Sequence, residues 1–429
     1  MTRRALHPAL LVTKREVLEH LLSLRFLVAT AMTALLLFVS VFVMVHDYRV
    51  RKDSFAVLEA RAIPRPGEYG VMAVVPPRPL SVFARGLDDV LDRGYDITAY
   101  SGITPHDRQT PATSLFTLFT PPDPLYIVKV LLSLVALLLS YDAISGEKER
   151  GTLRLVLSRP VSRSAVVAGK LAGGLAVVWV PFATLFLVSV AALVVSGAVA
   201  FGAGDFARMA LMLGASLVYI TFFLALGMLV SALSASSPRA LVASLFVWAL
   251  AVFAVPNAGQ LVAAQLSPMP STGTQEALRQ QAFAKNRFLS IRSRGRDPEG
   301  AVEAFNRDYD RLVERYRAAA DGLVATSKLL CRISPAASLT YVFTDLAGTG
   351  IGDLRRLNGA LVRYKTENLG ALVKQSDPKG SPPPPFTYVP ARLGGAWRQG
   401  LLLDLVLLVL AAMAAGTAAA IAAIRTDPR

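Results

Sequence analysis

Residues 26–46 form the unbroken apolar run FLVATAMTALLLFVSVFVMVH. At a rise of about 1.5 Å per residue, a helix of this length covers about 30 Å, the thickness of the hydrocarbon core of a bilayer. A cleaved signal peptide has a shorter apolar core, and here 25 residues precede the run. The run is therefore predicted to be a retained transmembrane helix.

Five further apolar runs are long enough to cross a membrane when modest tilt is allowed. They cover residues 125–141, 171–199, 207–230, 240–264 and 401–424. Six spans place both termini on the same side of the membrane. The composition agrees, because 53% of the 429 residues are hydrophobic and only 17% are charged, against about 25% in soluble domains.

Positive charge indicates which side is cytoplasmic. The stretches on the side of the termini hold 14 Lys and Arg in 68 residues, whereas the two opposite segments each exceed about 60 residues and hardly influence orientation. We therefore expect both termini in the cytoplasm. About half of the net charge of +15 belongs to this topological signal, so the basic composition requires no nucleic-acid partner.

The sequence thus predicts an all-α polytopic membrane protein with six transmembrane helices. Residues 1–25 are expected to form an amphipathic helix in the membrane interface, and residues 425–429 a short cytoplasmic tail. Two extracytoplasmic insertions, 47–124 and 265–400, are expected to be α-helical or mixed. Membrane lipid and an extracytoplasmic protein are their expected partners.

The second insertion contains apolar residues that recur at steps of three and four, the pattern of a packed helix pair. They are Val302, Phe305, Tyr309, Leu312, Tyr316, Ala319 and Leu323. The expected partner helix is the preceding stretch, residues 275–293.

Residues 142–170, called the polar loop below, are the most polar of the predicted cytoplasmic segments. With Tyr141 they read YDAISGEKERGTLRLVLSRPVSRSAVVAGK. Charges alternate from Glu147 to Arg150, Gly151 interrupts them, and Thr152 can cap a short helix starting at Leu153. On composition alone, a solvated loop whose basic residues fix the topology is the simpler interpretation.

The polar loop resembles the cytoplasmic loop of permeases of ATP-binding-cassette (ABC) transporters of the type-2 class. The resemblance follows the pattern GEKE-R-GTL, LS-P-SR and GK, carried by Gly146 to Leu153, Leu157, Ser158, Pro160, Ser162, Arg163, Gly169 and Lys170. The layout fits the branch with large extracytoplasmic insertions. The resemblance implies a permease in the bacterial inner (plasma) membrane that pairs with a second permease, as a homodimer or heterodimer, and binds a cytosolic ABC ATPase.

In that family the loop docks into a groove on the ATPase, so that closure of the ATPase dimer moves the spans. The residues to which this ATPase-coupling role is carried over are Gly146, Glu147, Lys148, Glu149, Arg150, Gly151, Thr152, Leu153, Pro160 and Arg163. Glu147, Glu149 and Arg150 are expected to form ion pairs with the partner surface. The sequence contains no GxxxxGK(S/T) phosphate loop, so ATP hydrolysis is expected on a separate chain, and no catalytic residue, cofactor or metal is predicted here.

An intramembrane aspartyl protease is one competing interpretation, because Tyr141–Asp142 and Gly202–Asp205 imitate the YD and GxGD pair of that class. The span at 171–199 separates the two carboxylates by roughly 30 Å, which is too far for a shared dyad. A membrane scaffold or receptor whose outer insertion binds a protein is a second alternative. An ion-driven secondary transporter is a third, although no internal repeat supports it.

Two ionisable residues lie inside predicted spans. Asp404 and Lys129 are both near the outer ends of their spans, where a side chain can extend to the interface. They are open to two interpretations, boundary residues or part of a substrate path.

Overall fold

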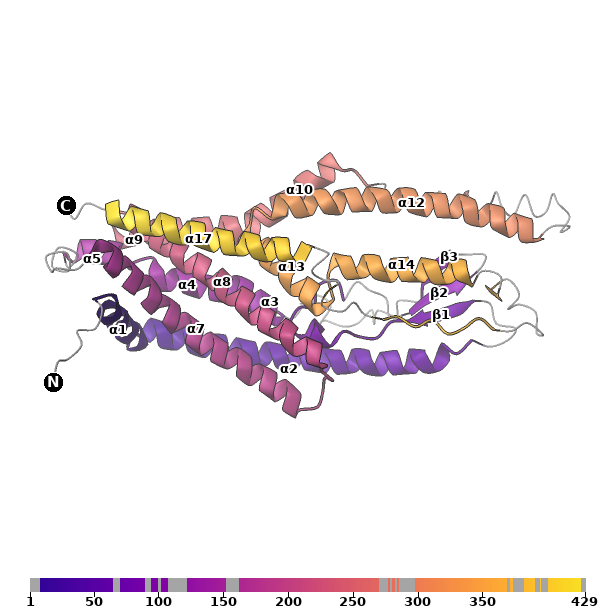
Figure 1. Cartoon of the computed structure of the whole chain (residues 1–429), viewed down its shortest axis with the longest axis horizontal. Helices are drawn as coiled ribbons and strands as arrows, with labels where there is room; N and C mark the ends of the chain where they lie inside the picture. Colours follow the sequence, from indigo (N-terminus) through magenta and orange to yellow (C-terminus); the bar gives the residue numbers. More distant parts are fainter. Residues whose placement is uncertain are drawn as a thin grey trace.

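The fold is described from a computed structural model. It describes residues 8–64, 70–88, 94–98, 102–106, 122–151, 162–269, 298–368, 371–372, 382–389 and 400–425, with the single positions 277, 280, 281, 284 and 394. The molecule is elongated, and the first described helix lies at the same end as the end of the last one (Figure 1). This end is called the terminal face below.

Six helical stretches in the described part of the chain are long and apolar enough to cross a membrane, which confirms the predicted six-span fold. They are Leu24–Arg61 (α2), Pro124–Glu149, Arg163–Val195 (α7), Ala203–Leu233 (α8), Ser237–Leu266 and Leu402–Arg425 (α17). The second stretch comprises α3 (Pro124–Tyr126), η3 (Ile127–Leu132), α4 (Ser133–Ser140) and α5 (Ser145–Glu149). The fifth comprises α9 (Ser237–Ala249), η4 (Leu250–Ala254) and α10 (Val255–Leu266).

Helix α8 lies at the centre of the bundle, where it packs against α4, α7 and α17. Its large side chains Tyr219 and Phe223 are fully buried. The contact between α8 and α4 is close because Gly227 has no side chain: a Cβ there would lie 2.1 Å from Ser140 Oγ. Alanines on the inner face of α17 allow a similarly close contact, since small residues let helix backbones approach in a membrane bundle.

A separate helix, α1 (Pro8–Leu21), precedes the first span, in line with the helix predicted over 1–25. It packs across the start of α7 at the terminal face. Ser23 separates it from α2 and caps that helix, because Ser23 Oγ accepts a hydrogen bond from the Phe26 N–H at 3.2 Å. The chain therefore turns sharply from α1 into the first span.

The opposite end carries what is called the distal module below, made of a small sheet, α12 (Pro298–Cys331) and α14 (Ile351–Glu367). Strands β1 (Val71–Val74), β2 (Gly94–Thr98) and β3 (Gly102–Pro105) form an antiparallel sheet in that order. Leu357 and Leu361 of α14 pack with Val71 and Ile97 in a shared apolar core. Helix α13 (Pro335–Ala347) and the short η1 (Pro79–Val82) lie between this module and the bundle.

The first span differs from its predicted extent. The apolar run ends at residue 46, but α2 continues to Arg61. Ion pairs with the segment that follows η1 hold this polar extension: Arg51 pairs with Asp88, and Arg85 approaches Asp47 at 2.9 Å. These partners are remote in sequence, so hydropathy alone does not indicate the extension.

Helix α12 covers the stretch whose spacing predicts a helix. Its predicted partner, residues 275–293, lies almost entirely outside the described residues, as do the side chains of Val302, Phe305, Tyr309 and Leu312. The C-terminal part of α12 packs against α10, where the Ser267 and Thr326 hydroxyls share a hydrogen bond of 3.0 Å. The distal module is thus joined directly to the fifth span.

Candidate functional site

The described start of the polar loop, residues 142–151, lies at the terminal face among the ends of several helices (Figure 1). Helix α5 is only one and a half turns long, and its first residue is anchored to α8. The backbone N–H groups of Ile144 and Ser145 both donate to Ser231 Oγ at 3.0 Å. Because Ile144, Ser145 and Ser231 are buried, these bonds fix the position of α5 against the end of the fourth span.

Lys148 ties the same helix to the end of α8. Its ammonium donates to the carbonyl oxygens of Ala232 at 2.7 Å and Ser234 at 3.2 Å. These carbonyls belong to the last turn of α8 and the residue after it, where acceptors lack intrahelical donors and the helix dipole favours a cation. Lys148 is therefore a capping residue for the fourth span.

Glu147 points inward. Its carboxylate pairs with Lys170 of α7 at 2.9 Å, and Lys170 also pairs with Glu16 of α1. The side chains of Lys170, Glu16 and Glu147 are only 8%, 12% and 18% exposed. Lys170 thus joins α1, α5 and α7 through a largely buried ionic cluster. Removing one partner from such a cluster strongly lowers the free energy of unfolding.

Close backbone approach makes this cluster possible. Gly169 and Gly173 face α1, and a Cβ on Gly169 would lie 2.7 Å from Val12 Cβ and 2.8 Å from the Ala9 carbonyl oxygen. Thr13 Oγ1 also donates to the Gly169 carbonyl at 3.2 Å. The GK pair of the motif therefore combines a contact site for α1 with the cation that binds it.

Glu149 and Arg150 lie at the exposed side of α5. Ser237 Oγ donates to Glu149 Oε2 at 2.7 Å, which places a carboxylate beside the N-terminus of α9. Arg150 Nε donates to the Gly146 carbonyl at 3.2 Å. Gly151 follows with φ of +69°, a left-handed conformation that favours glycine and ends the helix.

Thr152, Leu153 and Pro160 lie outside the described residues. The loop resumes at Ser162, whose Oγ accepts from the Ala165 N–H at 3.2 Å and caps α7. Arg163 then donates to the Ile424 carbonyl at 2.8 Å, near the end of α17. The described part of the polar loop therefore contacts α1, α7, α8, α9 and α17.

Sequence reasoning did not predict several of these partners. The helix predicted over 1–25 contains Glu16, and Ser231 follows the span predicted over 207–230, yet both residues contact the motif. Arg25 at the start of α2 pairs with Asp142 at 3.1 Å and donates to Tyr141 Oη at 3.2 Å. Their proximity follows from the packing of helices that are remote in sequence.

A family model described as "ABC-2 family transporter protein" matches residues 10–294. The chain belongs to this family. Over 43 residues it is 54% identical to the probable ABC transporter permease protein NosY of Stutzerimonas stutzeri and, separately, to that of Pseudomonas aeruginosa. Each match covers 10% of this chain and 16% of the relative.

Membership confirms the type-2 ABC resemblance of the polar loop and places the chain among ABC-2 permeases, the membrane components of such transporters. The geometry also opposes an aspartyl dyad in this permease. Asp142 pairs with Arg25 at the terminal face, whereas Asp205 accepts from the Gly202 N–H at 2.9 Å at the far end of α7. A whole span separates the two carboxylates.

The ionisable residues inside the spans have structural partners. Asp404 is fully buried and accepts two hydrogen bonds from Arg332, at 2.6 and 2.9 Å. The Lys129 ammonium lies 5.7 Å from the centre of the Tyr126 ring. Asp404 is therefore part of a contact between the last span and the residue that follows α12.

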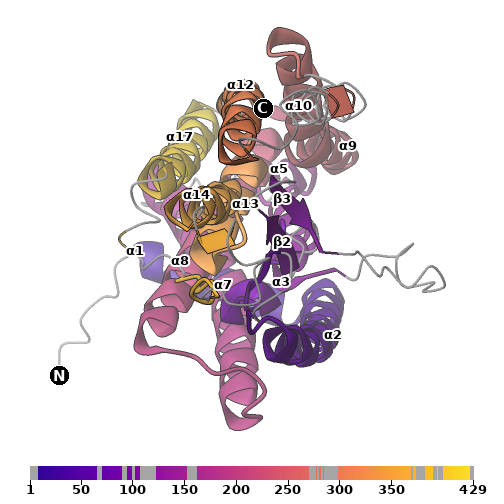
Figure 2. The same cartoon turned by 90° about the vertical axis from the view of Figure 1, so that its right-hand side faces the viewer.

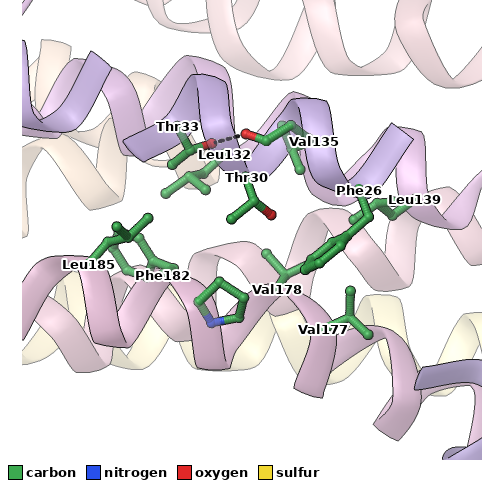
Figure 3. A pocket seen from close by; sticks show the side chains of 12 residues that line it. Phe26, Thr30, Thr33, Leu132, Val135, Leu139, Val177, Val178, Phe182 and Leu185 are labelled. Carbon is green, nitrogen blue, oxygen red and sulfur yellow. Dashed lines mark hydrogen bonds between the residues drawn. The ribbon is translucent and has the colours of Figure 1, made fainter. Parts of the chain in front are cut away.

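An apolar pocket of the permease lies within the bundle between α2, α4 and α7 (Figure 3). Thr30 and Thr33 are the hydroxyl side chains among its labelled lining residues, and Thr33 Oγ1 donates to the Ala29 carbonyl at 2.7 Å. Its volume is about 20 Å³. That is room for about one water molecule, so this pocket is too small for a substrate in the described conformation.

Proposed function

We propose that this ABC-2 permease uses the polar loop to couple a separate cytosolic ABC ATPase to movement of its spans. The observation that supports the proposal is the set of contacts at the terminal face. Glu147, Lys148 and Glu149 of α5 each contact another helix, so a displacement of α5 is transmitted to several spans. A solvated loop that only fixed topology would not require these buried contacts.

The contacts separate two roles within the motif. Glu147 and Lys148 bind other helices of the same chain, so we assign them to transmission of movement. Glu149, Arg150 and Gly151 are exposed at the end of α5, so we assign the ATPase contact to this end. This revises the expectation that Glu147 itself pairs with the ATPase.

The remaining parts of the proposal follow the family. Both termini and the polar loop lie in the cytoplasm, the distal module lies outside, and a second permease completes the transporter. The ATPase supplies the phosphate-binding loop that this sequence lacks. The substrate is unspecified, and the NosY relatives do not supply it because they match only a short stretch.

The test is to purify the tagged full-length chain from its own host and to measure how much ABC ATPase is recovered with it. Arg150→Glu is expected to reduce ATPase recovery about fivefold, as expected for an interface charge worth about 1 kcal/mol. Lys52→Glu is the matched control, because Lys52 is exposed on the distal extension of α2 and cannot reach a partner at the terminal face. Absence of any ABC ATPase from the wild-type preparation, or unchanged recovery with Arg150→Glu, overturns the proposal.

A further inference from the structure

The distal module contains a partly open cavity of about 840 Å³ between α12, α14 and the sheet. Seen from the distal end, α12 and α14 lie next to each other, with the sheet beside them (Figure 2). The cavity is within the size range of small-molecule sites, about 300 to 1,000 Å³. It is over forty times larger than the pocket inside the bundle.

The cavity is lined by one continuous face of α14. Ile351, Leu354, Leu361 and Val362 contribute apolar side chains along this face. Val324 contributes from α12. Two amphipathic helices therefore direct apolar residues toward a shared space.

The two ends of the cavity differ in their surroundings. Met269 lines it and lies three residues after the end of α10, which closes the fifth candidate span. Ile351 also lines it and is the first residue of α14, which begins just beyond the buried helix α13. The cavity thus begins close to the end of the fifth candidate span, and it continues outward to Tyr95 of the sheet and Lys365 of α14.

A polar edge runs along the same cavity. Arg355 Nε pairs with Asp321 Oδ1 at 2.7 Å across the space between α14 and α12. Their side chains are 46% and 58% exposed, so this pair is hydrated. An occupant with an apolar chain and a polar group matches the lining better than a wholly apolar or a wholly polar molecule does.

From this geometry we infer that the cavity binds an acyl chain of a phospholipid from the leaflet on the distal side of the membrane. The chain lies between Val324, Leu354 and Leu361, and the headgroup lies at the edge formed by Arg355 and Asp321. Met269 places one end of the cavity close to the end of the fifth candidate span, so the path of such a ligand from the membrane is short. Binding of this lipid does not depend on the ATPase coupling proposed above.

Gly359 offers a direct test. It lines the cavity, and a Cβ on it would meet no atom within 4 Å, so a larger side chain extends into the space without a clash. Gly322 is the matched control: a Cβ there is equally free, but Gly322 is exposed on α12 and does not line the cavity. Gly359→Phe and Gly322→Phe introduce the same residue into two helices.

The assay uses the full-length chain in nanodiscs that contain phosphatidylethanolamine with a photoreactive acyl chain. Labelled peptides are mapped by mass spectrometry, without added ATPase or ATP. We expect labelling of the cavity faces of α12 and α14 in the wild type and in Gly322→Phe. We expect about tenfold less in Gly359→Phe, because the ring displaces roughly two methylene groups of the lipid.

Labelling confined to the six spans, or equal labelling of α14 in the two glycine variants, overturns the inference. If Gly359→Phe loses the photolabel but still recovers the ABC ATPase in the experiment proposed above, the lipid site and the coupling site are separate. Retained labelling with no recoverable ATPase overturns the proposed function and leaves the lipid site standing.

Discussion

The ionic cluster at the terminal face predicts a large and asymmetric response to mutation. Lys170→Met removes the cation between Glu16 and Glu147 and leaves two carboxylates in a site whose side chains are less than a fifth exposed. Breaking a buried ion pair in this way costs about 3 to 5 kcal/mol. Glu16→Gln is expected to cost less, because Lys170 keeps Glu147 at 2.9 Å.

The double variant Glu16→Gln/Lys170→Met tests whether these effects share one cause. It removes one charge of each sign, so its destabilisation should be smaller than the sum of the two single effects by about 1 to 3 kcal/mol. The free energy of unfolding is measured by denaturant titration of the detergent-solubilised chain. Tryptic cleavage at the exposed Lys14 gives a second measurement, because α1 should detach in Lys170→Met. Additive free energies, or unchanged cleavage at Lys14, would refute the proposed role of Lys170 in holding α1.

Two further predictions concern the distal side. Arg332→Met leaves the fully buried Asp404 without the guanidinium that binds it, so we expect the free energy of unfolding to fall by about 3 kcal/mol. The double variant Arg332→Met/Asp404→Leu should recover most of this loss, because no buried charge remains. No recovery in the double variant contradicts the ion-pair explanation. Burial raises the pKa of Asp345 to about 6, above its unfolded value of 3.8. The folded chain therefore binds the proton more tightly, and this contribution to stability is fully present below pH 4. It amounts to about 3 kcal/mol at most and is lost as the pH rises through 6. Asp345→Asn should remove that pH dependence from the unfolding titration, whereas an unchanged profile assigns it to another group.

The sequence predicts the six spans because each is determined by local hydropathy. The apolar run at 26–46, for example, needs no information from the rest of the chain to be recognised. The extension of α2 to Arg61 depends on Asp88 and Arg85 in the segment after η1, which hydropathy does not reveal. The short strands are similarly non-local, because the register that pairs Val71 with Ile97 arises only in the folded sheet.

The same division applies to the candidate site. The motif locates the polar loop and its charged residues, because their types and spacing are local features. It does not give their partners: Lys170 meets Glu16 154 positions away, and Lys148 meets Ala232 84 positions away. Glu147 was consequently predicted to face outward, although the packing of α1 on α7 encloses it.

The last span, α17, is bonded at both of its ends to other parts of the chain, and this limits how it can move in the proposed coupling. At the terminal face, Arg163 binds the Ile424 carbonyl; at the other end, Arg332 binds Asp404 through two hydrogen bonds. A buried ion pair adds little net stability compared with apolar packing, but its fixed bidentate geometry specifies one register of the joined elements. Helix α17 therefore cannot rotate or slide without changing the position of Arg332, which follows directly after α12. In the proposed mechanism, a displacement at the terminal face that moves α17 therefore also moves Arg332 and the adjoining end of α12.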